Sequence, residues 1–287
     1  MQPEGLDPEA ASIPYFIIAY EEALRMQDKQ DNQSKIEQLQ KIIDESSSIV
    51  FFGGAGVSTE SGIPDFRSTS GLYHQQWAYP PETILSHSFF ETKTEEFYKF
   101  YREKMLFLDA EPNAAHKALA KLEEKGKLKA VVTQNIDGLH QKAGSKNVFE
   151  LHGSVLRNYC RKCGAFYDAE FIKNYDGSQN DGGASNYQRT VPRCTKDSCH
   201  GLIKPDVVLY EEGLDNNVIE GAVAAISSAD CLIIGGTSLV VYPAAGLVRY
   251  FHGKYLVLIN KSSTSYDASA DLAINEPIGE VFSKLKI

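Results

Sequence analysis

The strongest constraint on the fold is a series of short apolar runs that recur along the chain. The runs are Ile49–Gly53, Ala130–Thr133, Val148–Leu151, Val207–Tyr210, Cys231–Gly235, Tyr255–Asn260 and Leu272–Ile274. Most are rich in Val, Ile and Leu without polar alternation, which is typical of parallel strands covered on both faces. Helical patterns lie between several of them, at Asn113–Gly126, Asn216–Ser227 and Ala244–Phe251. This alternation predicts a doubly wound, Rossmann-like α/β fold with a parallel sheet.

Two stretches interrupt the alternation and predict a small inserted domain. Residues 72–111 are aromatic and helical in pattern. Residues 156–202 contain two cysteine pairs and a polar, glycine-rich loop, Asp176–Gln188. We expect these two stretches to form the small domain, as a helical insert and a metal-binding module. The large domain would then comprise residues 35–71, 112–155 and 203–287.

Residues 1–34 are expected to form an N-terminal extension, with a helix over residues 13–27. A further helix is predicted to begin near Ser34, because Ser34 and Glu37 form a capping-box signature. The apolar residues of this helix fall on one face, namely Ile36, Leu39, Ile42 and Ile43.

Four of the five cysteines fall in two closely spaced pairs, Cys160 with Cys163 and Cys194 with Cys199. Two such pairs separated by a loop are what a tetrahedral zinc site needs. Because four thiolates leave no open position for water, we expect one structural Zn²⁺. His200 in place of Cys199, or four unbound thiols, are the alternatives. Cys231 stands alone in a strand pattern and is expected in the core.

The chain has 287 residues and a formal net charge of −9, with no run of Lys and Arg. Nucleic-acid binding normally needs clustered basic side chains, so we expect no such partner. An acidic surface suits lysine-rich protein segments. The N-terminus lacks the basic region of a secretory signal, and the apolar run Ile13–Tyr20 is too short to cross a bilayer. We therefore expect a cytoplasmic protein without membrane contact, of open oligomeric state.

The first apolar run leads into the glycine-rich segment Gly53–Thr59. Small residues at this point allow the backbone to approach a pyrophosphate, and the following helix can offer free N–H groups. The segment lacks the usual G-x-G-x-x-G pattern, and no clear ribose-binding acid follows about twenty residues later. A tight strand–helix turn without a ligand is therefore the alternative.

Four longer segments accompany the cysteine pairs. They read GGAGVSTESGIPDFRS (53–68), TQNIDGLH (133–140), LHGS (151–154) and GTSLVVYPAA (236–245). Together they resemble the sirtuin family, particularly its bacterial protein deacylases, from about Ile36 to the C-terminus. The resemblance implies an NAD-dependent protein-lysine deacylase, expected to be a deacetylase, that yields deacylated lysine, nicotinamide and O-acyl-ADP-ribose. Protein mono-ADP-ribosyl transfer, NAD hydrolysis and a non-enzymatic NAD-binding module are the alternatives.

The resemblance implies that the large domain binds NAD. It assigns Ala55, Gly56 and Thr59 to the phosphate turn, and Phe66 and Arg67 to a cofactor loop. The nicotinamide pocket would contain Gln134, Asn135, Ile136 and Asp137. Phosphate or ribose would contact Thr237, Ser238 and Asn260, and adenine would contact Ile278.

His152 matches the family's general base, and the chemistry of deacylation supports this assignment. A ribose hydroxyl must lose a proton, and histidine, with an unperturbed pKa of about 6.5, can accept one near neutral pH. His152 follows a predicted strand, at the edge where α/β sheets keep their sites. Asn135 and Asp137 follow another strand and are expected to act at the same edge, although Asn-x-Asp is also common turn chemistry.

The resemblance implies that acylated-lysine proteins bind as an extended strand bordered by Val208 and Tyr210. Main-chain pairing would provide affinity with little reading of sequence. The family's strand ends in a Phe-Gly-Glu-like pattern, whereas this chain reads Tyr210-Glu211-Glu212. The extra glutamate leads us to expect a preference for basic residues beside the target lysine.

Acyl choice is predicted from the helical insert. Family members that prefer acidic acyl groups resemble one another in a Tyr-x-x-Arg pair. Here Tyr98 is present, but Tyr101 stands at the arginine position and Arg102 is one residue away. A guanidinium binds a carboxylate through two bonds that a phenol cannot replace. We therefore expect acetyl or longer neutral acyl groups to be preferred over succinyl.

Overall fold

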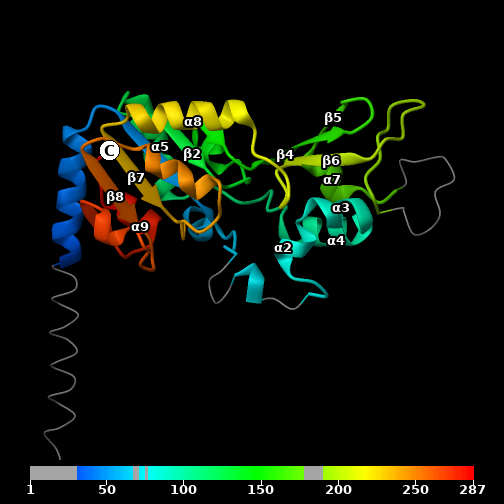
Figure 1. Ribbon diagram of the computed structural model, residues 1–287, viewed down its shortest axis with the longest axis horizontal. Helices are drawn as coiled ribbons and strands as arrows, with labels where there is room; N and C mark the ends of the chain where they lie inside the picture. The colour runs from blue at the N-terminus through cyan, green and yellow to red at the C-terminus, as the bar shows by residue number, and fades with distance from the viewer. Residues whose placement is uncertain (1–30, 67–70, 75–76, 178–189) are drawn as a thin grey trace, which may run out of the picture.

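The structure, a computed structural model, describes residues 31–66, 71–74, 77–177 and 190–287. The described residues form a large lobe around one sheet and a smaller lobe beside it (Figure 1). The predicted helix over residues 13–27 and most of the predicted loop Asp176–Gln188 lie outside the described residues.

The sheet of the large lobe has six strands in the order β3-β2-β1-β7-β8-β9, and all neighbouring strands are parallel. The strand order reverses between β1 and β7, which is the switch point of a doubly wound sheet. The predicted fold class is therefore confirmed. The strands are β1 (Ile49–Gly53), β2 (Leu128–Thr133), β3 (Val148–Glu150), β7 (Cys231–Gly235), β8 (Tyr255–Ile259) and β9 (Leu272–Ile274).

Helices cover both faces of this sheet, which explains why the central strands β1 and β7 are buried and without polar side chains along their whole length. The helix of residues 31–45, α5 (Ala114–Glu124) and α9 (Ile278–Ser283) pack on the face that contains Phe51. The opposite face, which contains Val50 and Phe52, packs against α8 (Asn216–Ser228) and the 3₁₀ helix η5 (Ala244–Tyr250). Successive strand side chains alternate between these two buried faces.

The small lobe is built on a three-stranded antiparallel sheet in the order β5-β4-β6. Four short helices pack on it around an aromatic core that includes Phe90, Phe97 and Tyr101. The strands are β4 (Gly153–Cys160), β5 (Phe166–Asp168) and β6 (Ile203–Val207), and the helices are α2 (Pro81–Ile84), α3 (His87–Thr92), α4 (Thr94–Lys104) and α7 (Ala169–Asn174). The remaining short elements are α6 (Leu139–Ala143) and the 3₁₀ helices Ala55–Val57, Thr59–Ser61, Leu72–His74 and Asp267–Ser269.

Two local predictions were wrong. The run Val207–Tyr210 is not a strand of the parallel sheet, because only Val207 is in a strand, at the end of antiparallel β6. This run is apolar because Val207 and Leu209 pack in the core of the small lobe, while Val208 N bonds to His152 O. Ser34 does not cap a helix, since the chain is already helical at residue 31. The predicted domain boundaries remain a proposal. Residues 153–155 and 203–207, which were assigned to the large domain, lie in strands β4 and β6 of the smaller sheet.

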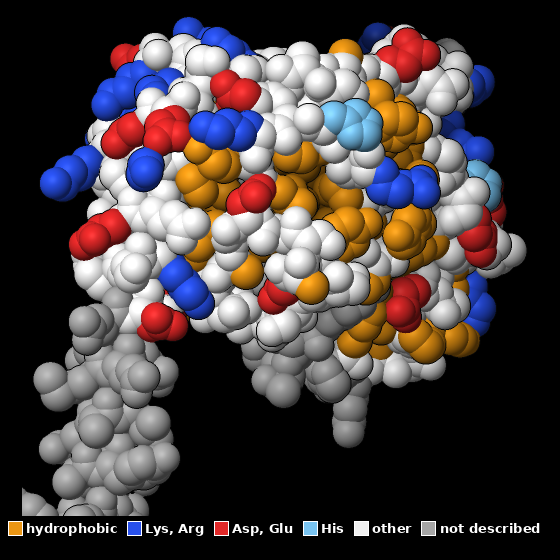
Figure 2. All heavy atoms as spheres, turned by 60° about the vertical axis from the view of Figure 1, so that its left-hand side comes forward, with side chains coloured by type: hydrophobic (Ala, Val, Ile, Leu, Met, Phe, Trp, Pro, Cys, Tyr) orange, Lys and Arg blue, Asp and Glu red, His pale blue; other side chains and the backbone are white. Residues whose placement is uncertain are grey.

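No helix among the described residues is both long and apolar enough to cross a bilayer. The face turned forward in Figure 2 carries an area of exposed hydrophobic side chains, with basic and acidic side chains interspersed around it. On this face the lysines and arginines do not gather into a patch of one sign.

Two histidines are buried together between α5 and α6. The rings of His116 and His140 lie 4.7 Å apart between centroids, and both residues are almost fully buried. His116 Nδ1 accepts a hydrogen bond from Asn113 N at the start of α5. Burial lowers the pKa of His116 to about 4. Burial, together with the neighbouring His116, lowers the pKa of His140 to about 3.

We predict that this pair makes the fold sensitive to acid. In the unfolded chain these two histidines bind protons near pH 6.5, whereas in the folded chain they stay neutral. Their contribution to the free energy of unfolding is therefore full above about pH 6.5 and is lost as the pH drops toward 4. The variant His140→Phe should show a smaller loss of unfolding free energy between pH 7 and 5 than the unaltered protein. Urea unfolding at each pH measures this, and zinc release in acid is common to both proteins. Equal pH slopes would contradict the prediction.

Candidate active site

A cavity of about 1080 Å³ lies between the carboxyl edge of the parallel sheet and the small lobe. Its lining brings together residues from segments far apart in the sequence. Arg67 lies outside the described residues, and the chemical roles of the others stay predictions. The predicted residues in the lining are Ala55, Gly56, Thr59, Phe66, Gln134, Asn135, Ile136, Asp137, His152, Val208, Tyr210, Thr237, Ser238, Asn260 and Ile278.

The imidazole of His152 is fixed in one tautomer. Its Nδ1 lies 2.9 Å from the carbonyl oxygen of Gln134. Because a carbonyl oxygen only accepts, Nδ1 carries the hydrogen and Nε2 keeps its lone pair. Burial lowers the pKa of His152, and the bond to Gln134 partly opposes this effect. At neutral pH the ring is therefore a neutral base with Nε2 as its acceptor atom.

Asn135 and Asp137 are joined by a residue that the sequence analysis missed, Ser58. Asn135 Nδ2 donates to Ser58 Oγ at 3.1 Å, and Ser58 Oγ donates to Asp137 Oδ2 at 2.7 Å. The other carboxylate oxygen of Asp137 accepts from Leu139 N at 2.9 Å. Burial raises the pKa of Asp137, and the bonds from Leu139 and Ser58 oppose the rise. Ser58 lies in the quoted motif 53–68, but nothing in its spacing marked it out from a turn serine.

The turns after β1 and β7 approach each other backbone to backbone. Gly56 N donates to Gly236 O at 2.8 Å. A Cβ on Gly236 would lie 2.3 Å from Val57 N, and one on Gly56 would lie 2.8 Å from Gly236 Cα. Gly236 also has a φ of 60°, in the left-handed region that favours glycine. These glycines allow a close approach that any side chain would prevent.

The turn after β7 is held by polar side chains from the neighbouring strands. Thr237 N donates to Asn260 Oδ1 at 2.9 Å, and Thr237 Oγ1 donates to Gln134 Oε1 at 3.1 Å. The amide nitrogens Gln134 Nε2 and Asn260 Nδ2 are buried without a hydrogen-bond partner among the described residues. Such orphaned donors in a cavity lining fit a polar ligand that would accept from them.

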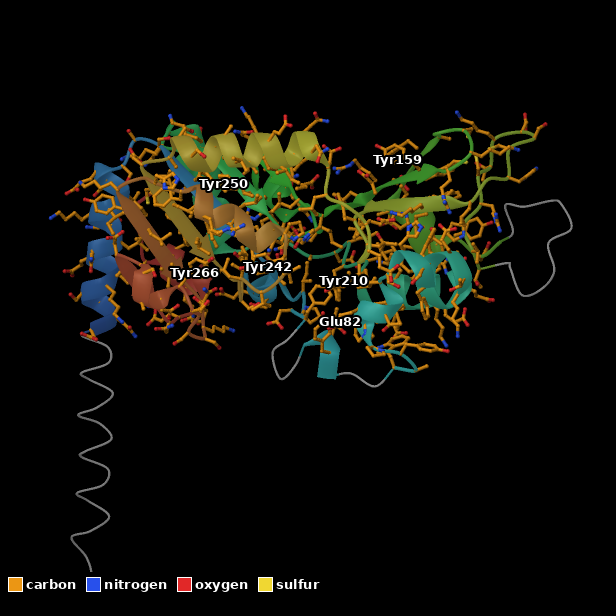
Figure 3. All side chains as sticks on the ribbon, viewed as in Figure 1. Glu82, Tyr159, Tyr210, Tyr242, Tyr250 and Tyr266 are labelled. Atoms are coloured by element: carbon orange, nitrogen blue, oxygen red, sulfur yellow. The ribbon has the colours of Figure 1, made fainter. Side chains whose placement is uncertain are left out.

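The segment after β6 runs along the cavity and is tied to the helical insert. Tyr210 N donates to Leu85 O, and His87 N donates to Tyr210 O. The side chain of Tyr210 lies at the junction of the lobes, where its Oη is 3.2 Å from Tyr73 Oη (Figure 3). The neighbouring glutamates bond within the protein, Glu211 to Ser88 and Glu212 to Lys204 and His87. The expected use of the extra carboxylate for basic substrate residues is therefore not supported by its contacts.

The two tyrosines used to predict acyl choice are core residues. Tyr98 and Tyr101 are fully buried in the small lobe and are not among the residues that line the cavity. The hydroxyl of Tyr98 donates to Ile203 O. The hydroxyl of Tyr101 has no partner among the described residues, and burial raises its pKa well above the usual value.

The four predicted cysteine ligands converge in the small lobe. The sulfur atoms of Cys160, Cys163, Cys194 and Cys199 all lie within 4.8 Å of one another. The pairs Cys160–Cys199 and Cys163–Cys194 are separated by 3.6 Å, too far for disulfides. Ligands at about 2.3 Å around a tetrahedral zinc lie about 3.8 Å apart, so the cluster fits one Zn²⁺ without an open position.

Tyr167 on β5 supports this cluster. Its hydroxyl donates to Cys194 Sγ at 3.1 Å and accepts from Thr195 N at 2.8 Å. The backbone N–H thus orients the hydroxyl toward the sulfur. Groups that orient metal ligands in this way affect metal affinity nearly as strongly as some ligands do.

The fold and site define a class: the chain belongs to the Sir2 family, whose model matches residues 54–243. It is 63% identical to an NAD-dependent protein deacetylase of Clostridium acetobutylicum over 249 residues, covering 86% of this chain and 96% of the relative. A relative of the same description from Clostridium perfringens is 63% identical over 254 residues, covering 88% and 98%.

Solved structures agree with this assignment. One is described as Sir2 with a deacetylated p53 peptide and 3′-O-acetyl ADP ribose. It is 41% identical with a TM-score of 0.75, and the match covers 86% of this chain and 96% of that one. Another, described as Sir2 with a p53 peptide and NAD⁺, is 41% identical with a TM-score of 0.73, covering 87% and 96%.

We predict that Tyr167→Phe will release zinc about ten to a hundred times faster than the unaltered protein, because Cys194 loses its oriented donor. A colorimetric chelator measures the release. Tyr159→Phe is the matched control, since Tyr159 is a partly exposed tyrosine on the neighbouring strand β4. Equal release rates for the two variants would show that the Tyr167 hydroxyl does not hold the site.

Proposed function

We propose that the protein removes acetyl groups from lysine side chains of other proteins and consumes NAD in doing so. The observation that carries this proposal is the neutral His152, whose Nε2 is the acceptor in the same cavity as Asn135 and Asp137. Membership of the Sir2 family, and relatives described as NAD-dependent protein deacetylases, support it. The products are the free lysine, nicotinamide and O-acetyl-ADP-ribose.

The paired turns at Gly56 and Gly236 are the proposed site for the diphosphate of NAD. Their glycines leave the backbone bare, with Ala55, Thr59 and Ser238 beside it in the lining. The orphaned Asn260 Nδ2 suits an adenosine ribose hydroxyl, and Gln134 Nε2 suits an acceptor nearer the reacting end. When bound, NAD supplies a ribose whose bond to nicotinamide is ready to break.

Asn135 and Asp137 are the proposed nicotinamide-binding residues. The Ser58 hydroxyl holds both side chains, so their positions are set before any ligand enters. The pocket is buried, and a buried carboxylate and amide can read a carboxamide that offers both a donor and an acceptor. Ile136, between them, gives the ring an apolar contact.

His152 is the proposed general base. Its Nε2 accepts a proton from a ribose hydroxyl while Nδ1 remains bonded to the Gln134 carbonyl. The protonated ring is then stabilised by that same carbonyl, which accepts a stronger hydrogen bond from the charged form. Burial favours the neutral ring before the reaction, so the base is ready at neutral pH.

The acylated lysine is proposed to enter beside Val208 and Tyr210 as part of an extended segment. Val208 N donates to His152 O at 3.0 Å, and this contact supports a substrate strand that lies beside His152. We therefore propose that the partners are acylated proteins, recognised through the acylated lysine and its main chain rather than through a particular amino-acid sequence around it. We place the activity in the cytoplasm, where reduced cysteines can keep their zinc.

We predict that His152→Ala will abolish acetyl removal while the variant remains folded. The purified protein is incubated with an acetyl-lysine peptide, with and without NAD, and products are followed by mass spectrometry. His252→Ala is the control, since His252 is an exposed histidine outside the cavity lining. Nicotinamide release with the peptide still acetylated would instead support ADP-ribosyl transfer or NAD hydrolysis. No NAD consumption would support a binding module.

We predict that kcat/KM for acetyl-lysine will exceed that for succinyl-lysine by about tenfold or more, because a carboxylate needs a charged partner when desolvated. Within the described residues the cavity lining contains no arginine, and Tyr101 is buried in the small lobe outside the lining. Matched peptides that differ only in the acyl group give the ratio. A ratio near one would remove the basis for this preference.

A further inference from the structure

Glu211 has an unusual backbone at the edge of the cavity. Its φ is 76°, in the left-handed region that is unfavourable for a residue with a side chain. The residue is exposed and lines the cavity. A strained conformation of this kind persists only where surrounding contacts hold it.

The contacts that hold it come from the side chain of Glu211 itself. Oε2 accepts from Ser88 N at 2.8 Å, and Oε1 accepts from Ser88 Oγ at 3.0 Å. Both carboxylate oxygens are thus bound to one residue of the helical insert. Hydrogen bonds to a charged acceptor are stronger than neutral ones, and two of them fix the side chain's direction as well.

The residues on either side of Glu211 are also bound. Tyr210 pairs through its main chain with Leu85 and His87. Glu212 accepts from Leu209 N at 2.9 Å, from Lys204 at 3.0 Å and from His87 at 2.9 Å. Among the described residues, none is bonded to the N–H or the C=O of Glu211. The left-handed turn therefore leaves the N–H and the C=O of Glu211 without partners among the described residues, although Tyr210 O and Glu212 N on either side are bonded.

We propose that Glu211 is a positioning residue for the protein substrate. Its carboxylate, bound to Ser88, holds the left-handed turn, and the turn keeps the N–H and C=O of Glu211 available to the main chain of the acylated segment. This inference rests on the proposed function. Both oxygens of Glu211 point to Ser88, and Glu212 is paired with Lys204, so any attraction of a basic substrate residue to these carboxylates is that of an exposed, screened charge and contributes little. Recognition at this edge reads backbone rather than charge.

Four variants test the proposal through steady-state kinetics on an acetyl-lysine peptide. Glu211→Ala keeps the backbone cost and loses the carboxylate, so KM for the peptide should rise about tenfold. Glu211→Gly adopts the same φ without cost, so the rise should be smaller, about threefold. Glu211→Gln keeps an acceptor for Ser88 N and should restore most of the affinity. Ser88→Ala should resemble the Gln variant.

The same measurements separate positioning from general damage. KM for NAD, kcat and the unfolding midpoint should remain within about twofold or a few degrees of the unaltered protein. Glu170→Ala, which removes another exposed small-lobe glutamate, is the matched control. Parallel changes in both KM values and in stability would mean a merely structural role and would overturn the proposal.

The amino-acid composition of the peptide substrate provides an independent test of the proposal. Peptides with lysine or with alanine beside the acetyl-lysine should differ by less than about threefold in KM, since an exposed carboxylate directed to Ser88 adds little to the binding of a neighbouring lysine. A strong preference for the basic peptide that disappears in Glu211→Ala would contradict the proposal. If the unaltered protein deacetylates but the Ala variant has the same peptide KM, this inference fails alone. If the unaltered protein shows no deacetylation, the proposed function fails.

Discussion

The site depends on the contact between two backbone turns, one after β1 and one after β7. Gly56 and Gly236 allow these turns to hydrogen-bond directly, with no side chain between them. Because β1 and β7 are adjacent parallel strands, their carboxyl ends leave the sheet together, at its switch point. Every other element of the cavity is arranged around this contact: Gln134 and Asn260 come from the strands next to it and hold Thr237.

The small lobe is stabilised in a different way from the large lobe. Its three-stranded sheet is too small to bury much apolar surface, so aromatic packing and the four cysteines hold it together. A zinc ion bound by the four cysteines would join two chain segments that are about thirty residues apart in sequence, between Cys163 and Cys194. It would stiffen the lobe that presents β6 and the following segment to the cavity.

The sequence predicted the parallel sheet because β1 and β7 are apolar at every position, a pattern that two-sided burial requires. The cavity residues were expected from long motifs that resemble those of the Sir2 family. The prediction failed where apolar character had another cause: Val207 and Leu209 belong to the core of the small lobe rather than to the parallel sheet. Ser58 and Glu211 could not be identified either, because a hydrogen-bond bridge and a left-handed φ depend on residues that meet only in three dimensions.

The bond from Val208 N to His152 O has a consequence for motion between the lobes. The chain enters β4 of the small lobe just after His152 and leaves β6 just before Val208, so two of its crossings between the lobes are joined at His152. The imidazole is meanwhile anchored to the large lobe through Gln134. The small lobe would then rotate about the contact between Val208 and His152. The cavity between the lobes would widen or narrow, while the distance from the His152 ring to the parallel sheet stays the same.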